Sequence, residues 1–201
     1  ANLYSLQNDY ERSIFYLNIS HYLNPKFRFN LTLLIENFYL NKNYEKVKKN
    51  LKYFNKKDDF YYWFKIKKQG QIISEEVNDK EALNFINKKF KKIEDPSVKI
   101  IFDMGNFNKN SKKYKDAIVY YDQIISIIDP NSFIYANILY RRGSSYERLG
   151  NYLKSDKDFL KSLEINPDDA YVLNYLAYSW LERDYKIDSA IQMLEKAYAL
   201  R

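Results

Sequence analysis

The chain has 201 residues, 46% of them hydrophobic, and a formal net charge of +7 at pH 7. This hydrophobic share is typical of a folded protein, and no run of about 18 apolar residues predicts a membrane-spanning helix. The absence of cysteine excludes disulfides and thiolate metal sites, and His21, the single histidine, cannot by itself form a histidine cluster or a histidine-based triad. We therefore predict no metal site and no cofactor.

Pairs of residues that suit a packed helix face recur along the whole chain with a spacing of about 35 residues. The small residue of each pair is Ser13, Val47, Ala82, Ala117, Ser155 or Ala190. The large apolar residue that follows four positions later is Leu17, Leu51, Ile86, Tyr121, Phe159 or Leu194. Residues four apart lie on one face of a helix, so the pattern predicts a repeated helical unit.

The glycines and prolines fit the same frame. Gly70, Gly105 and Gly143 recur at one position of the unit, where two helices cross closely and only a small side chain fits. Gly150 falls where the first helix of its unit must turn. All prolines fall between units, where a helix must stop: Pro25, Pro96, Pro130 and Pro167.

The frame divides the chain into six helix–turn–helix units, of which the first is incomplete, within one domain that covers residues 1–201. We predict approximate units at residues 1–27, 28–58, 59–97, 98–131, 132–169 and 170–201. The first unit lacks most of its first helix, and the chain opens with Ala-Asn-Leu, so we expect a piece of a longer array. We also predict that Asp79 caps a helix and that the last helix has an exposed apolar edge.

Residues 136–169 read ANILYRRGSSYERLGNYLKSDKDFLKSLEINPDD and form one complete unit of 34 residues. This helix–turn–helix pattern resembles the tetratricopeptide repeat (TPR), and the likeness is sharpest from about Tyr135 onward. The resemblance implies an all-α fold, a right-handed α-α superhelix of about 5.5 repeats and about 12 helices, truncated at both ends. Two residues depart from the family pattern: Arg142 stands where an apolar residue is usual, and Asn108 stands where an aromatic residue is usual.

The last two units are similar to those of bacterial multi-TPR scaffold proteins, in which a unit ending ERLG…NPD precedes a segment like VLNYLAYSWLERD. That resemblance leaves the compartment open between the bacterial cytoplasm and the cell envelope (periplasm). It implies a non-enzymatic scaffold that binds a protein or peptide partner in a concave groove. Adjacent carboxylates such as Asp58 and Asp59 lie at helix starts, where capping explains them, and no glycine-rich phosphate loop is present.

In the TPR family the groove is lined by fixed positions of each first helix. Carried over to this chain, these positions are Phe29, Thr32, Glu36, Phe64, Lys67, Gln71, Lys99, Phe102, Asn106, Asn137, Tyr140, Ser144, Tyr171, Asn174 and Tyr178. Tyrosine and asparagine suit peptide recognition, because the ring supplies contact area and the amide both donates and accepts hydrogen bonds. A carboxylate clamp known in some TPR proteins is disfavoured, since Asp103 stands where it needs asparagine.

Two alternatives stay open. The lysine runs 46–57 and 88–92 carry the aromatics Tyr53, Phe54 and Phe90, a combination that nucleic acids or other anionic surfaces attract. We expect these lysines on outward positions and these aromatics in the core, which disfavours nucleic acid. The chain could also serve as a structural spacer in a larger assembly, or associate with a second copy through its terminal repeat.

Overall fold

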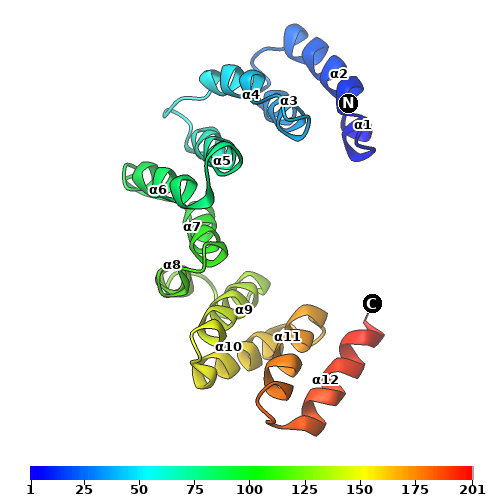
Figure 1. The fold of residues 1–201 in the computed structure, drawn as a ribbon, viewed down its shortest axis with the longest axis vertical. Coiled ribbons are helices and arrows are strands. Elements are labelled where there is room, and N and C mark those ends of the chain that lie inside the picture. The colour runs from blue at the N-terminus through cyan, green and yellow to red at the C-terminus, as the bar shows by residue number, and fades with distance from the viewer. Residues whose placement is uncertain (201) are drawn as a thin grey trace. The chain divides into compact units, whose positions relative to one another are not determined.

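The computed structural model describes residues 1–200 and confirms the all-α prediction. Within that range the chain forms twelve α-helices, one short 3-10 helix and no strand (Figure 1). The helices follow one another as antiparallel pairs, as expected for TPR units. They divide into two compact units, Ala1–Lys89 and a second unit that starts at Phe90. Arg201, the last residue of the predicted sixth repeat, lies outside the described residues.

The first compact unit contains three helix pairs. Their bounds are α1 Asn2–Leu6 and α2 Tyr10–Leu23, α3 Arg28–Leu40 and α4 Tyr44–Asn50, and α5 Asp59–Glu76 and α6 Asp79–Phe90. The 3-10 helix Leu51–Tyr53 continues directly from α4. The core of this unit is a cluster of buried aliphatic and aromatic side chains that includes Leu31, Leu34, Ile35, Phe38, Val47, Leu51, Phe54 and Ile72.

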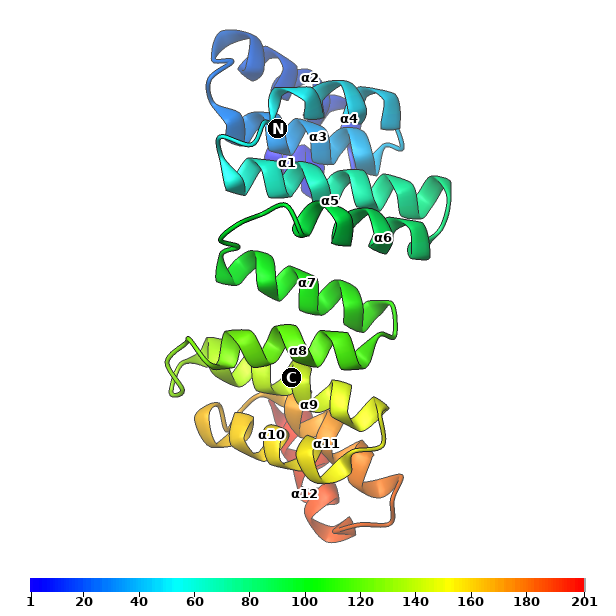
Figure 2. The ribbon, with the colours of Figure 1, turned by 90° about the vertical axis from the view of Figure 1, so that its left-hand side faces the viewer.

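The second compact unit also contains three helix pairs, from α7 to α12 (Figure 2). Their bounds are α7 Val98–Asn110 and α8 Tyr114–Ile125, α9 Phe133–Arg148 and α10 Tyr152–Ile165, and α11 Ala170–Leu181 and α12 Ile187–Ala199. One buried cluster joins α7, α8 and α9 through Ile101, Tyr121 and Ile138. Another joins α10, α11 and α12 through Phe159, Trp180 and Ala190.

The close helix crossings predicted at three glycines are confirmed. A methyl group added at Gly70 would lie 2.6 Å from Ile86 Cδ1, and one added at Gly105 would lie 2.6 Å from Tyr121 Cε1. At Gly143 the nearest atoms would be 3.1 Å away. The repeated small residues are buried as well, with at most 6% of any of them exposed. Each pair therefore packs as tightly as its smallest residues allow.

In five of the six described pairs the turn contains a left-handed residue, and glycine supplies it only once. Gly150 has φ +73°, while the equivalent turns place Lys42 at φ 55° and Lys112 at φ 58°. A side chain makes this conformation less favourable by about 1–2 kcal/mol. The turns at Lys42 and Lys112 therefore form without glycine, and this conformation lowers their contribution to stability.

Two sequence predictions about local structure are wrong. The helix α6 begins at Asp79, and its cap is Asn78, whose Oδ1 accepts a hydrogen bond from Glu81 N at 2.9 Å. Tyr53 is 60% exposed rather than in the core, whereas Phe54 is buried. The 3-10 helix has three residues per turn, so it rotates Tyr53 away from the face that Leu51 buries.

On α12, Ile187 and Ile191 are each 46% exposed, as predicted for an exposed apolar edge.

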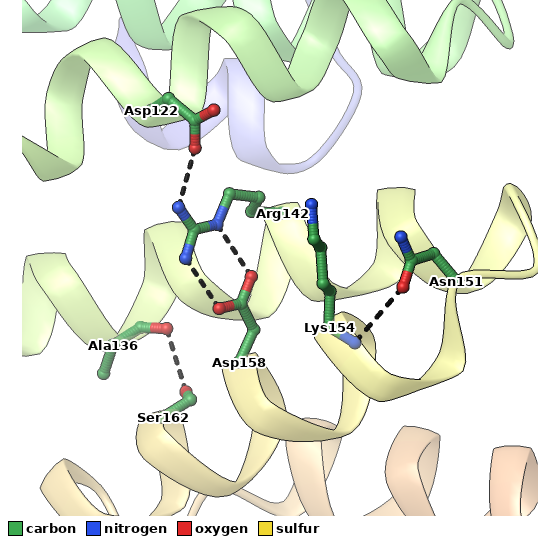
Figure 3. Close-up of polar contacts among 7 residues, drawn as sticks. All are labelled: Asp122, Ala136, Arg142, Asn151, Lys154, Asp158 and Ser162. Carbon is green, nitrogen blue, oxygen red and sulfur yellow. Dashed lines mark hydrogen bonds and ion pairs between the residues drawn. The ribbon is translucent and has the colours of Figure 1, made fainter.

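Arg142, which replaces an apolar family residue, lies in an ion network that spans three helices (Figure 3). Its Nε and Nη2 atoms donate to both oxygens of the buried Asp158 on α10, each at 2.7 Å, and Nη1 donates to Asp122 on α8 at 2.6 Å. Burial alone would lower the pKa of Arg142, but these hydrogen bonds more than offset that effect and raise it. The substitution is therefore compensated by acidic partners on both neighbouring helices.

Candidate functional site

In the first compact unit, two of the six predicted groove residues are engaged in contacts within the protein. Thr32 on α3 is only 8% exposed, and its hydroxyl donates to Phe29 O at 2.7 Å. Glu36 on the same helix accepts a hydrogen bond from Lys68 Nζ at 2.7 Å. Phe29, which is 54% exposed, and Gln71 are the exposed residues among the predicted positions of this unit, while Phe64 and Lys67 are half-buried.

The ion pair between Glu36 and Lys68 joins α3 to α5. Only 5% of the Lys68 side chain is exposed, against 38% for Glu36. The ammonium lies 4.4 Å from the ring centroid of Tyr39, so an aromatic face also contacts the charge. Burial lowers the pKa of Lys68, and Glu36 opposes that shift in part. Sequence reasoning missed this pair, because a lysine in a lysine-rich helix gives no signal that it is buried.

The second compact unit presents more of the predicted residues on α7, α9 and α11. Lys99, Asn137, Tyr171 and Tyr178 are exposed, and Phe102, Asn106, Tyr140 and Asn174 are half-buried. Ser144 is fully buried and donates to Arg141 O at 2.9 Å, so it offers no side-chain atom to a ligand. We call the eight accessible residues, with the side chains between them, the α7–α9–α11 face.

A polar network links the α7 and α9 parts of this face. Asn106 Oδ1 accepts hydrogen bonds from Tyr121 OH at 2.9 Å and from Arg141 Nη1 at 3.2 Å. Arg141 Nε also donates to Asn137 Oδ1 at 3.0 Å, and its guanidinium lies 5.0 Å from the ring centroid of Phe102. Arg141 therefore connects three of the predicted positions, although it was not among them.

Tyr140 belongs both to this face and to the core. Its ring centroid lies 6.0 Å from that of Phe159 and 5.9 Å from that of Tyr175. Burial raises the pKa of its hydroxyl, so the ring stays neutral at physiological pH. Because the ring packs against the core, alanine at this position would disturb stability as well as the surface.

A hollow of about 230 Å³ lies between α9 and α11. It is lined by Glu147, Arg148, Asn174, Tyr175, Tyr178, Ser179 and Glu182. Tyr175 OH donates to Glu147 Oε2 at 3.1 Å, and burial, followed by the charge of Glu147, raises the pKa of Tyr175 to about 12. Two predicted residues, Asn174 and Tyr178, thus border a recess that contains amide, hydroxyl and charged groups.

Lys109, in the last turn of α7, is a half-buried cation on the same face. Its Nζ lies 5.7 Å from the ring centroid of Tyr140. Burial, and the nearby charges of Arg141 and Arg148, lower the pKa of Lys109 to about 8. Sequence reasoning missed this residue too, since its surroundings come from the next repeat.

The basic run at residues 46–57 is partly neutralised within the first unit. Lys48 Nζ lies 2.9 Å from Glu76 and 3.5 Å from Glu45. Lys46 lies over the ring of Phe38 at 5.3 Å. Part of this basic run therefore makes contacts within the first compact unit.

Within residues 1–200, no group of acidic, histidine or cysteine side chains is arranged to hold a metal ion. The same residues contain no helix with both the length and the apolar character needed to cross a membrane.

Comparison with known proteins identifies the repeat. Residues 136–169 match the family profile described as the tetratricopeptide repeat. A TPR repeat-containing protein of Methanocaldococcus jannaschii is 34% identical over 85 residues, which cover 42% of this chain and 14% of that protein. The peptidyl-prolyl cis-trans isomerase CYP7 of Saccharomyces cerevisiae is 28% identical over 130 residues, 62% of this chain and 31% of the isomerase. The chain thus spans less than a third of either relative.

A solved structure shares the fold across nearly the whole chain. The crystal structure of the APC/C hetero-tetramer Cut9–Hcn1 contains a chain that matches with a TM-score of 0.64 at 16% identity. The match covers 98% of this chain and 38% of that one. At this identity the likeness concerns the fold alone, and it agrees with the antiparallel helix pairs described above.

Proposed function

Since the chain is a tetratricopeptide repeat protein, we propose that it is a non-enzymatic scaffold whose α7–α9–α11 face binds an extended segment of a partner protein. TPR proteins generally mediate protein–protein interactions. The observation that carries the proposal for this face is the pair Tyr171 and Tyr178, which are 80% and 54% exposed. They lie seven residues apart on α11, hence on one side of the helix.

The surroundings of these tyrosines suit a peptide. Large exposed rings supply contact area at a small cost in side-chain entropy, and Asn137 and Asn174 can donate to and accept from a peptide backbone. The recess between α9 and α11 lies beside Tyr178 and has room for one side chain of the partner. The first compact unit offers less, because Thr32 is buried and Glu36 is tied to Lys68.

The test compares partner capture by the full chain with capture by a Tyr171→Ala/Tyr178→Ala variant. Both side chains are exposed, so we expect the variant to keep its melting temperature and to lose the specific partner by about tenfold or more. The matched control is Tyr22→Ala/Tyr53→Ala, which removes two tyrosines that are 86% and 60% exposed in the first compact unit. Capture that is equal for all three proteins would contradict this face as the binding surface.

A further inference from the structure

The outward side of α2 carries a row of exposed apolar side chains. Phe15, Ile19 and Tyr22 are spaced by four and three residues, so they lie on one side of the helix. Their side chains are 61%, 42% and 86% exposed. Ser13 and Leu17, the buried residues of α2, lie on the opposite side. We call Phe15, Ile19 and Tyr22 the α2 stripe.

The repeat does not need apolar residues at these positions. In every repeat they follow the small residue of the second helix by two, six and nine residues. No other repeat has more than one large apolar or aromatic residue there. The third and fifth repeats have only polar residues at these positions, namely Asn84, Lys88, Lys91, Lys157, Lys161 and Glu164. Single exposed apolar residues are common on protein surfaces, whereas a continuous row of them indicates an interaction surface.

Neighbouring rings border the α2 stripe without covering it. The ring of Tyr16 stacks on that of Tyr4 in α1, with 5.6 Å between centroids, and meets the ring of Phe15 edge to face at 5.4 Å. Near the C-terminal end of α2, the exposed ring of Tyr53 lies 5.8 Å from that of His21. The helix α1 therefore packs beside the stripe and leaves it open.

The two ends of α2 differ in charge. At the N-terminal end, Asp9 is paired with Arg12 at 3.1 Å, and Glu11 is exposed next to them. At the C-terminal end, the exposed lysines Lys26 and Lys52 supply positive charge. A surface with an acidic end and a basic end is complementary to a second copy of itself that runs in the opposite direction.

We propose that the α2 stripe is a dimer interface, in which α2 of one copy packs antiparallel against α2 of a second copy. With the twofold axis between Asn18 and Ile19, Phe15 of each copy lies opposite Tyr22 of the other, and Glu11 lies opposite the residue at position 26. The two rings then pack as an aromatic pair. This interface goes beyond the proposed function, because it uses the first compact unit and not the α7–α9–α11 face.

The size of the α2 stripe sets the strength of the dimer. An aromatic side chain buries about 150–250 Å² when it is fully covered, so the stripe and its neighbours would bury roughly 400–600 Å² per copy. Stable interfaces bury about 800 Å² per partner. We therefore expect a reversible dimer with a Kd of about 10–100 µM.

Sedimentation velocity of the full chain, from about 1 to about 300 µM, tests the interface. The unmodified chain should shift from monomer to dimer across this range. Ile19→Glu places two like charges beside the twofold axis and should raise the Kd by about tenfold or more, with an unchanged melting temperature because the side chain is 42% exposed. The matched control is Ile191→Glu, which changes an isoleucine on α12 that is 46% exposed and should dimerise like the unmodified chain.

A charge exchange tests the antiparallel arrangement. Phe15→Lys and Tyr22→Glu should each weaken the dimer. The double variant should regain affinity, because the lysine of one copy then lies opposite the glutamate of the other. A parallel pair would bring like charges together instead, so a double variant as weak as either single variant would overturn the proposed arrangement.

Three further results would overturn the dimer interface. They are a chain that stays monomeric at about 300 µM, a dimer that is lost with Ile191→Glu but not with Ile19→Glu, and a monomer that binds phosphatidylglycerol vesicles unless it carries Ile19→Glu. The last result would assign the α2 stripe to a membrane surface. Failure here leaves the proposed function untouched, since Tyr22→Ala/Tyr53→Ala should weaken the dimer and still capture the partner protein.

Discussion

Lys68 in the first compact unit and Lys109 in the second both lie beside a tyrosine ring, but their nearest charged neighbours have opposite signs. Lys68 and Lys109 each place the ammonium against a tyrosine ring, at 4.4 Å and 5.7 Å, and burial lowers the pKa of both. Lys68 has Glu36 at 2.7 Å, whereas Lys109 has Arg141 and Arg148 nearby.

The difference separates a buried charge that has a counter-ion from a half-buried charge that has none in the part of the chain that the structure describes. A buried cation that receives its counter-ion from the next helix helps fix how those helices pack. A half-buried cation whose charged neighbours are further cations lowers the stability of the folded protein. Three substitutions test this contrast, and we take them in order of expected size.

Glu36→Ala should have the largest effect, because it leaves Lys68 buried without its counter-ion. We expect the free energy of unfolding to fall by about 2–3 kcal/mol, less than for a fully buried pair since 38% of the Glu36 side chain is exposed. Urea unfolding measures the loss. The double variant Glu36→Ala/Lys68→Met should recover most of it, and a single variant as stable as the parent would show that the pair is not structural.

Lys109→Met should act in the opposite direction and raise the free energy of unfolding by about 1–2 kcal/mol at pH 7. The sign follows from proton binding. Folding lowers the pKa of Lys109 from 10.5 to about 8, so between these values the unfolded chain holds more protons. The stability contributed by this group therefore rises with pH across that window and carries its full penalty below pH 8.

The measurement is the melting temperature of both proteins from pH 7 to pH 10, in which the variant's advantage should shrink as pH rises. Taking the difference between the two proteins removes the contribution of other lysines and tyrosines. An advantage that stays constant across this range would contradict the lowered pKa of Lys109.

Arg141→Gln should have the smallest effect. It removes one of the two nearby cations, so the pKa of Lys109 should move up toward its ordinary value. An NMR titration of isotopically labelled lysine side chains reads this pKa directly. Arg12→Gln, a substitution of an arginine with 70% of its side chain exposed in the first compact unit, is the control. No change in the pKa with Arg141→Gln would place the arginine too far away to act.

The sequence was sufficient to predict the helix pairs and their crossings. Gly70, Gly105 and Gly143 could be placed because a close crossing excludes every larger side chain, and that constraint acts at a fixed position of each repeat. The cap of α6 was placed one residue late, since Asn78 and Asp79 are equally good capping residues and only the backbone decides between them.

The candidate site was predicted less completely. Tyr171 and Tyr178 are exposed where the family pattern implies, but Ser144 is buried because its hydroxyl turns back to the carbonyl of Arg141. Lys109 could not be distinguished from the other lysines of the chain. Its lowered pKa depends on Arg141 and Arg148 in the following repeat, and the residues around Lys109 in the sequence do not reveal that proximity.

The ion network of Arg142 has a consequence for how the second compact unit comes apart. One guanidinium binds Asp158 within its own repeat and Asp122 in the repeat before it. In repeat proteins, cooperativity of unfolding depends on such contacts between neighbours, because each repeat is otherwise marginal alone. Unfolding either repeat would leave a charged side chain of the other repeat without its partner. We therefore expect the amide protons of α8, α9 and α10 to exchange with solvent in a single cooperative unfolding step.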